Sequence, residues 1–192
     1  MGRIQTFDTV DAVRAARAVF WEHGFEGASL PELERATGVG RSSIYHAFGS
    51  KRGLFDAAVQ SYLDEVIRPR LRPLTVAPVQ AGALEEYLSG LRTALLAQGT
   101  LPATSGCMLV NSAGAPIGHD EAVAHTIAAY RTELRDAMLA GVRARLPQLD
   151  PAEQETLADS CAGLVIAAFA LVRVDPEQSA RSIDTALALL RR

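Results

Sequence analysis

Residues 24–55 read GFEGASLPELERATGVGRSSIYHAFGSKRGLF, and this stretch carries the signals of two short helices separated by a turn. Ser29 and Glu32 have the spacing of an N-cap and its capping-box partner, so they predict a helix that starts at residue 30. The glycines in residues 38–40 tolerate left-handed backbone angles and favour a tight turn. A second short helix is expected over about 41–47. This order is typical of a helix-turn-helix.

The side chains of this segment fall into two sets that are expected to face opposite ways. The apolar set is expected to form the inside: Leu33, Ala36, Val39, Ile44 and Phe48. The polar set is left toward solvent: Arg41, Ser42, Ser43, Tyr45 and His46. Arginine can donate two hydrogen bonds to guanine and serine can donate or accept, while phosphate contacts set the register. The second helix is therefore predicted to read a DNA major groove.

The same segment resembles the DNA-binding region of the TetR family of bacterial transcriptional regulators. The matching positions are Phe25 after a glycine, Ser29, Leu33, Gly38-Val39, Ile44-Tyr45, Phe48, Ser50-Lys51 and Leu54-Phe55. The preceding DAVRAARAVFWEHG resembles the first helix of that family. The resemblance is strong to about residue 60, and the remaining chain has a family-like length.

The resemblance implies a role for each polar position. Ser29 and Lys51 would contact phosphates. Base edges would be met by Arg41, Ser42 and Ser43, and the backbone or thymine methyl groups by Tyr45 and His46. The alternative is that the serines only solvate a surface helix and that the tyrosine packs.

Three positions depart from the family pattern. Glu34 stands where a small residue is common, and Gly40 stands where a serine is common. We expect Gly40 to remove a helix cap and a phosphate contact. Gly53 replaces the usual glutamate and is expected to weaken the cap of the following helix.

Charge is unevenly distributed along the 192 residues. The chain has a formal net charge of −3, so it is not a basic nucleic-acid binder as a whole. Residues 1–60 carry seven basic and seven acidic side chains, whereas the rest carries 12 and 15. The N-terminal third is neutral and the remainder is acidic, a contrast that suits an N-terminal module binding a polyanion.

Apolar periodicity close to 3.6 residues predicts an all-α protein of about nine helices. Residues 1–55 are predicted to form the helix-turn-helix DNA-binding domain, and residues 56–192 a helical ligand-binding and dimerisation domain. Residues 68–78 and 99–106 are expected to be loops. The expected helices cover about 8–23, 30–37, 41–47, a segment that Ser50 caps and that ends before Pro69, 79–97, 107–114, 120–145, 150–173 and 175–190.

Residues 161–172, CAGLVIAAFALV, are apolar on all sides of a helix and must be covered all round. Small residues there would allow close approach of another helix: Ala162, Gly163, Ala167, Ala168 and Ala170. The resemblance implies a homodimer through the last two helices, and burial within one chain is the alternative. The run of about 12 residues is shorter than the roughly 20 of a membrane span, so no membrane association is expected.

The resemblance also implies a ligand pocket among the middle helices. Four residues are candidates: Cys107, Asn111, Tyr130 and Phe169. Asn111 needs a hydrogen-bond partner, which backbone or a ligand could supply. Cys107 is either a buried apolar residue or a thiol sensor, and the two aromatic residues could equally be core. Because charges are scarce from residue 79 to 118, a fairly apolar small-molecule effector is expected.

No cofactor or metal is expected, because Cys107 and Cys161 lack ligand spacing and His119 and His125 lie six residues apart. The N-terminus has no apolar signal core, so a cytoplasmic protein is expected. The sequence predicts no enzyme. It predicts a ligand-responsive repressor that binds a palindromic operator as a dimer. The alternative is a similar helical ligand-binding or adaptor protein that no longer reads DNA.

Overall fold

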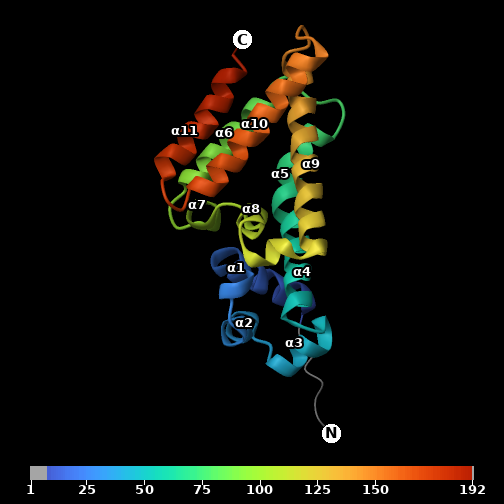
Figure 1. The fold of residues 1–192 in the computed structure, drawn as a ribbon, viewed down its shortest axis with the longest axis vertical. Coiled ribbons are helices and arrows are strands. Elements are labelled where there is room, and N and C mark those ends of the chain that lie inside the picture. Colours follow the sequence, from blue (N-terminus) through green and yellow to red (C-terminus); the bar gives the residue numbers. More distant parts are fainter. Residues whose placement is uncertain (1–7, 192) are drawn as a thin grey trace.

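The computed structural model describes residues 8–191, and no strand occurs within them. The chain forms an elongated stack with a small helical head at one end and long helices at the other (Figure 1). Its elements are α1 (Thr9–Gly27), α2 (Leu30–Thr37), α3 (Arg41–Phe48), α4 (Lys51–Tyr62), the π-helical turn η1 (Leu63–Ile67), α5 (Arg68–Thr75), α6 (Ala83–Leu96), α7 (Leu101–Ser105), α8 (Met108–Ala113), the 3₁₀ turn η2 (Pro116–His119), α9 (Glu121–Arg145), α10 (Pro151–Leu171) and α11 (Pro176–Leu189). The all-α prediction is confirmed.

Each expected helix is present in the described part of the chain, with two differences. A short helix, α7, lies within the predicted loop 99–106. The prediction of a connector over 68–78 is wrong, because α4, η1 and α5 follow one another without a break to Thr75.

The continuous helix formed by α4, η1 and α5, which we call the rod, contains two prolines in α5 that do not end it. Pro69 lies in the first turn of α5, just after the wider π-helical turn, where its missing N–H costs least. Leu63, Ile67, Leu71 and Leu74 are all buried and keep one face of the rod against the core. Burial of this apolar stripe outweighs the cost of Pro73 inside the helix.

The predicted helix caps are confirmed. Ser29 forms a complete capping box with Glu32, and Asp150 forms one with Glu153. Ser50 Oγ accepts from the Gly53 N–H at 3.0 Å. Asp175 accepts from the Gln178 N–H at 2.9 Å. Each cap satisfies a backbone donor that helix geometry leaves free.

We call α1–α4 the head and the elements from η1 to α11 the body. The predicted domain boundary at residue 55 falls inside α4, which packs against α1 and leads straight into η1. The boundary stays a prediction. The head core is aromatic, with Phe20, Phe25 and Phe55 in mutual contact.

The body is a layer of long helices in which α10 packs against both α9 and α11, and α11 against α6. By length and composition α10 could cross a membrane, with a mean hydropathy of 1.2 over its most apolar window. Within that window, 44% is already buried inside the chain. This packing makes α10 a member of the helical layer.

Candidate nucleic-acid interface

The turn between α2 and α3 fixes the angle of the two helices. Gly38 adopts φ +68°, a left-handed conformation that favours glycine. Leu33, Val39 and Ile44 are buried beneath α1, as predicted. The prediction for Ala36 is wrong: it is exposed, because α2 turns Leu30, Leu33 and Thr37 inward and leaves Ala36 outside that stripe.

The five polar residues predicted to face outward on α3 are all exposed: Arg41, Ser42, Ser43, Tyr45 and His46. Ile44 anchors the opposite side. Arg41 lies over the Tyr45 ring, with its Cζ atom 5.5 Å from the ring centroid. This cation–π contact pre-orders a long side chain that can donate to a base edge or a phosphate.

The N-terminus of α3 is capped from another helix. Gly40 supplies no side-chain cap, but the Glu34 carboxylate on α2 accepts from the Arg41 backbone N–H. The expected loss of a cap at Gly40 is confirmed, and the carboxylate of Glu34 replaces that cap, so the two departures from the family pattern compensate each other. Sequence reasoning missed this role of Glu34, although an acid seven residues ahead of an uncapped helix start was a visible signal.

Ser29 and Lys51 both have partners within the head. The Ser29 hydroxyl donates to Glu32 Oε2 at 2.7 Å while capping α2. This bond is the leading cause that lowers the pKa of the Glu32 carboxyl. Lys51 Nζ lies 4.7 Å from the centroid of the Phe25 ring and is half-buried. Their predicted phosphate contacts stay predictions.

Gly53 has a packing role. A Cβ atom at this position would stand 1.9 Å from the Phe48 carbonyl oxygen. The last turn of α3 therefore approaches α4 so closely that only glycine fits. The Ser50 hydroxyl accepts from the Gly53 N–H, but without a glutamate at residue 53 the cap lacks the reciprocal bond that completes the capping boxes at Ser29 and Asp150.

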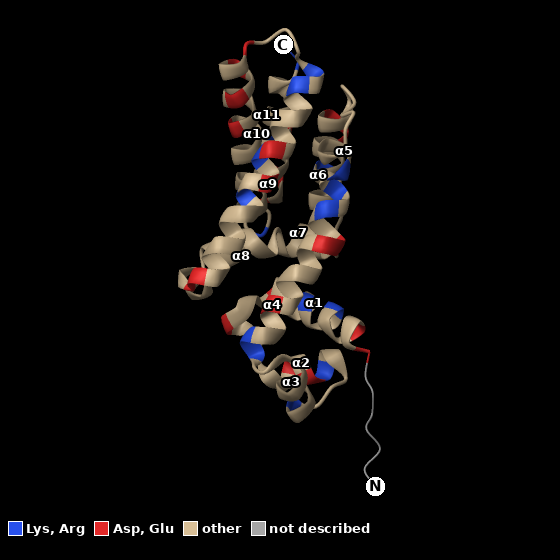
Figure 2. Ribbon diagram, turned by 90° about the vertical axis from the view of Figure 1, so that its right-hand side faces the viewer, with Lys and Arg blue, Asp and Glu red and all other residues tan. Residues whose placement is uncertain are grey.

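Ion pairs separate the basic residues of the head into two groups. Arg14 and Arg17 both reach Glu65 in η1, at 2.9 Å. Arg52 pairs with Asp56 and Asp120. Within residues 8–191, Arg35, Arg41 and Lys51 form no ion pair with a carboxylate, and the α2–α3 end of the head presents basic segments (Figure 2). Arg35 is a candidate DNA contact that sequence reasoning missed. The structure indicates it because the side chain is exposed on α2.

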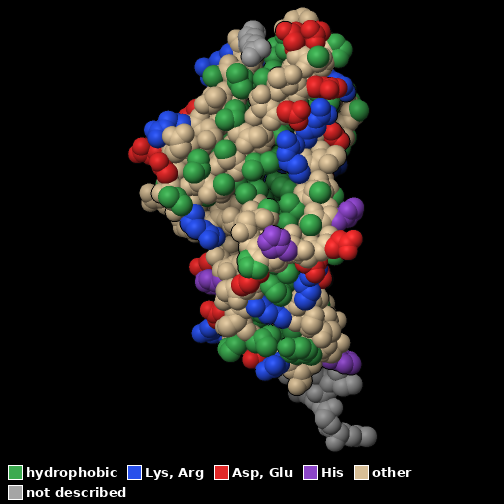
Figure 3. All heavy atoms as spheres, in the orientation of Figure 1, with side chains coloured by type: hydrophobic (Ala, Val, Ile, Leu, Met, Phe, Trp, Pro, Cys, Tyr) green, Lys and Arg blue, Asp and Glu red, His purple; other side chains and the backbone are tan. Residues whose placement is uncertain are grey.

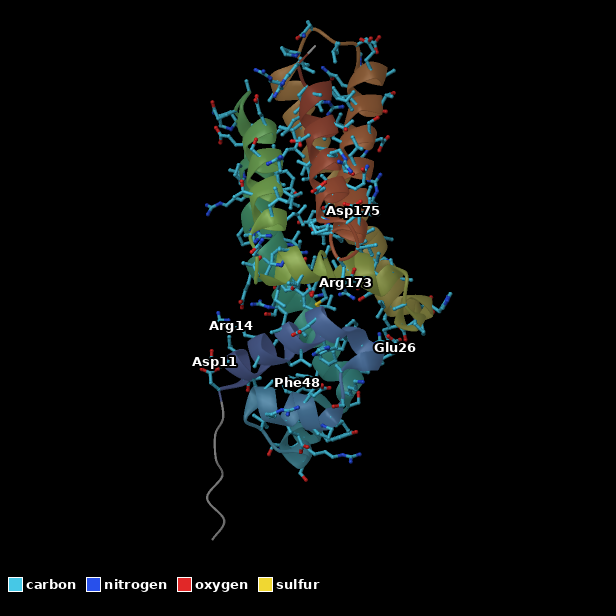
Figure 4. The ribbon with its side chains drawn as sticks, turned by 90° about the vertical axis from the view of Figure 1, so that its left-hand side faces the viewer. Asp11, Arg14, Glu26, Phe48, Arg173 and Asp175 are labelled. Atoms are coloured by element: carbon cyan, nitrogen blue, oxygen red, sulfur yellow. The ribbon has the colours of Figure 1, made fainter. Side chains whose placement is uncertain are left out.

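Polar contacts join the head to the body. Trp21 Nε1 donates to the Gly106 carbonyl at 3.0 Å in a buried site. Glu26, at the end of α1, accepts from the Ile117 N–H of η2 at 2.8 Å. Arg173, beyond α10, reaches the Glu22 carbonyl at 3.5 Å, and Figure 4 shows Arg173 and Glu26 at the junction. These bonds fix α1 to the turn between α7 and α8, to η2 and to the segment after α10.

Two of the four predicted ligand residues come together near this junction. The Cys107 thiol lies 3.9 Å from Tyr130 Oη. Burial is the main cause that raises the pKa of the Cys107 thiol, so the group is a neutral thiol at neutral pH.

The other two predicted residues lie apart from this pair. Asn111 Nδ2 donates to the Ser105 carbonyl at 2.6 Å, so backbone satisfies it. Phe169 is buried in α10, and its carbonyl oxygen would lie 2.3 Å from a Cβ at Gly106. The structure holds Phe169 against the turn before α8.

A half-open cavity of about 410 Å³ lies between α5 and α6, which pack side by side (Figure 2). Its wall is formed by Pro69, Arg70 and Pro73 of α5 together with Ala83, Tyr87 and Leu91 among the α6 residues. None of the four predicted ligand residues lines it. Its volume falls within the range of small-molecule sites.

Comparison with known proteins shows one consistent likeness. Residues 12–58 match the family model described as bacterial regulatory proteins, tetR family. The HTH-type transcriptional regulator YezE of Bacillus subtilis (strain 168) is 34% identical over 146 residues, covering 74% of this chain and 72% of that protein. The HTH-type transcriptional repressor ComR of Escherichia coli (strain K12) is 30% identical over 112 residues, 58% of this chain and 52% of ComR.

Among solved structures, a cysteine-substituted form of the TetR family transcriptional regulator CifR superposes with a TM-score of 0.79 at 30% identity. The match covers 97% of this chain and 98% of that one. That structure contains a 26-bp double-strand operator DNA.

Proposed function

This chain belongs to the TetR family of bacterial regulatory proteins and is a DNA-binding transcriptional regulator; on that premise we propose that it is a ligand-responsive repressor that binds a palindromic operator as a dimer. The observation that carries the proposal is the outward face of α3, where five polar side chains stand exposed over a buried Ile44. Arg14, Arg17 and Arg52 of the head are engaged in ion pairs with carboxylates. Arg35, Arg41 and Lys51 form no ion pair within residues 8–191, so they are available to phosphates and bases.

We propose that Arg41, Ser42 and Ser43 meet base edges. Tyr45 and His46 would contact the backbone or thymine methyl groups. Lys51 and Ser29 would contact phosphates. The Arg41–Tyr45 stacking supports the first assignment, because a guanidinium already held over a ring loses less freedom on binding a guanine. Ser29 would first have to release its hydroxyl hydrogen from Glu32.

The dimer is proposed to form through α10 and α11. Gly163 and Ala170 are exposed on α10, and Ile166 and Ala167 are half-buried. Ala162 and Ala168 are buried within the chain, so they do not offer a surface to a partner. Figure 3 shows hydrophobic side chains spread over the body on the face it displays. Two recognition helices about 34–36 Å apart would read the two halves of a palindrome.

Release by an effector is proposed to pass through the junction. Trp21, Glu26 and Arg52 tie the head to Gly106, Ile117 and Asp120 of the body. A ligand that binds better to one arrangement of the body would bias the position of the head and the spacing of two α3 helices. Because its target is chromosomal DNA, the regulator is proposed to act in the cytoplasm.

Selection of bound duplexes from a random DNA pool, at two salt concentrations, tests the proposal. We expect a palindromic sequence to be enriched and the affinity to fall with salt at a slope of roughly −0.9 per phosphate contacted. The mass of the free protein, measured in parallel, should be that of a dimer. An absence of enrichment at low salt would count against operator reading, and a monomeric mass against the palindrome.

A reporter gene placed behind the recovered sequence tests the direction of regulation. Expression should fall when the regulator is present and recover when Arg41 is replaced by alanine. A rise in expression with the intact protein would make it an activator.

A further inference from the structure

The cavity between α5 and α6 has the polarity of a binding site for a small anion with an apolar body. The chain runs up α5 and returns down α6 after residues 76–82 (Figure 1). Apolar side chains form most of the wall between the two helices, and Arg70 is its one cation. The cavity therefore combines a cation with a lining that favours hydrocarbon.

Arg70 is the cation of the cavity. It makes no ion pair and no hydrogen bond with any residue between 8 and 191. Arg68, two residues earlier, is held by Asp64 and by Glu133 at 3.3 Å. Arg70 is exposed at the rim of the cavity, and its guanidinium can hold a carboxylate through two parallel hydrogen bonds.

Tyr87 adds a neutral donor to the same wall. Its hydroxyl makes no hydrogen bond to a residue in the described part of the chain, although the side chain is half-buried. Burial raises the pKa of Tyr87 above its ordinary value, and Arg70 acts in the opposite direction. The phenol therefore stays protonated at neutral pH and can donate to an oxygen of a bound anion.

The one acid of the lining is Glu86, in the first turn of α6. Glu86 Oε1 lies 3.5 Å from where a Cβ of residue 82 would stand, beside the first turn of α6. The helix dipole favours a carboxylate at that place. Arg70 alone can balance a single negative charge, and Glu86 would oppose the second charge of a phosphate.

We propose that this cavity binds a monocarboxylate with an apolar body, whose head group is held by Arg70 and Tyr87 and whose hydrocarbon lies against Pro69, Pro73 and Leu91. This molecule is the effector, an assignment that rests on the proposed ligand-responsive repression. The α6 wall of the cavity packs against α7, and Gly106, directly after α7, accepts the hydrogen bond from Trp21 of the head. A ligand that moves α6 therefore acts on the junction.

Calorimetric titration of the full chain without DNA tests the binding site. The probes are benzoate, phenylacetate, octanoate and decanoate, each paired with its uncharged amide. At least one acid should bind about tenfold or more tightly than its amide, since a charged head group satisfied by a guanidinium contributes at least that factor. Equal binding of every acid and its amide, or no binding by any acid, would overturn the proposal.

Substitutions identify the residues responsible. Arg70→Met should abolish the preference for the acid and leave amide binding unchanged, and Tyr87→Phe should weaken acid binding about threefold to tenfold. Arg143→Met is the control, because Arg143 is an exposed arginine of α9 that does not line this cavity. Acid binding that survives in Arg70→Met, with the variant melting at the wild-type temperature, would refute the site.

A second measurement separates this proposal from the proposed function. Once an operator is recovered, the acid that binds should release it from wild-type protein and not from Arg70→Met. If the acid binds through Arg70 but the operator stays bound, the effector assignment is wrong. A failure to recover any operator would instead count against the proposed repression and leave the calorimetric result standing.

Discussion

The head and the body use polar side chains in opposite ways. On α3 of the head, five polar residues stand in solvent, and Arg41 is stacked on Tyr45 without a carboxylate partner within the described residues. At the centre of the body, Cys107 and Tyr130 are buried and bonded to each other and to neighbours. A surface that reads a long polyanion must leave its donors open, whereas an interior must satisfy each polar group.

The head and the body should also differ in the amino-acid substitutions that each can accept. The head contains short helices, of which α3 and α4 approach closely at Gly53, and the body contains long helices whose apolar faces pack on one another. Substitutions in the two regions should therefore separate loss of folding, loss of DNA reading and loss of coupling.

The largest effect is expected at Gly53. Gly53→Ala should lower the free energy of unfolding by about 3 kcal/mol, because its Cβ would collide with the Phe48 carbonyl and push α3 away from α4. Urea unfolding followed by circular dichroism measures this change in the free energy of unfolding. Gly90→Ala, on α6, is the control: no atom lies within 4 Å of its Cβ, so it should be neutral or stabilising. Equal stability of the two variants would show that the head is not limited by this contact.

Arg41→Ala should cost about 1–3 kcal/mol in operator affinity and relax the sequence preference. The reason is that Arg41 is exposed and pre-ordered on the outward face of α3. Fluorescence anisotropy on the selected operator and on its single-base variants measures both quantities. A lower affinity with unchanged discrimination would make Arg41 a phosphate contact and would leave base reading to the serines.

Trp21→Phe probes the junction between the two regions. It removes the donor to the buried Gly106 carbonyl and should lower the free energy of unfolding by about 1–2 kcal/mol while keeping the aromatic packing on Tyr62. We also expect operator release by effector to need more ligand. Val19→Ala, also on α1 and half-buried, controls for a general loss of packing. If release is unchanged in Trp21→Phe, coupling does not pass through this bond.

Glu34→Gln should strengthen binding to operator and to random duplexes alike by about 0.5–1 kcal/mol. The amide oxygen can still accept from the Arg41 N–H, but the negative charge at the start of α3 is gone. Anisotropy on both kinds of duplex measures the change. Glu34→Ala also loses the cap and should be less stable. Weaker binding of Glu34→Gln at one base pair only would mean that the carboxylate reads a base.

The smallest effect is expected at Asp120. Hydrogen bonds from Arg52 are the leading cause that lowers the pKa of the Asp120 carboxyl to about 2, with further help from the Val123 N–H. Its stabilising contribution is complete above the unfolded pKa near 4 and is lost as the pH falls toward 2. Thermal melting between pH 5 and pH 2 should fall less steeply in Asp120→Asn than in wild type. Parallel curves would show that the pair does not stabilise the head–body junction.

Prediction from sequence succeeded where local chemistry decides the structure. Ser29, Ser50, Asp150 and Asp175 cap the expected helices because each side chain reaches a backbone N–H two or three residues away. Gly38 turns where a left-handed residue is needed. Prediction from sequence was less successful where distant segments meet. Pro69 and Ala36 are examples, because their environments depend on which helices pack against them.

The candidate sites show the same division. The exposed face of α3 follows from the spacing of Ile44 among polar residues, so it could be predicted. The cavity of Arg70 and Tyr87 could not, because its two walls are 17 residues apart and become neighbours only when α6 folds back on α5. Asn111 was left open between backbone and ligand, and the Ser105 carbonyl is its partner.

By itself, the amino-acid sequence determined the helices, their caps, the helix-turn-helix and the family, because these depend on residues within one or two helical turns of each other. Only the tertiary structure decided that Glu34 caps α3, that the rod continues past Pro69, and that Cys107 contacts Tyr130. The physical reason is that hydrogen bonds and apolar burial between distant segments have no local sequence period. Their partners are set by how the helices pack.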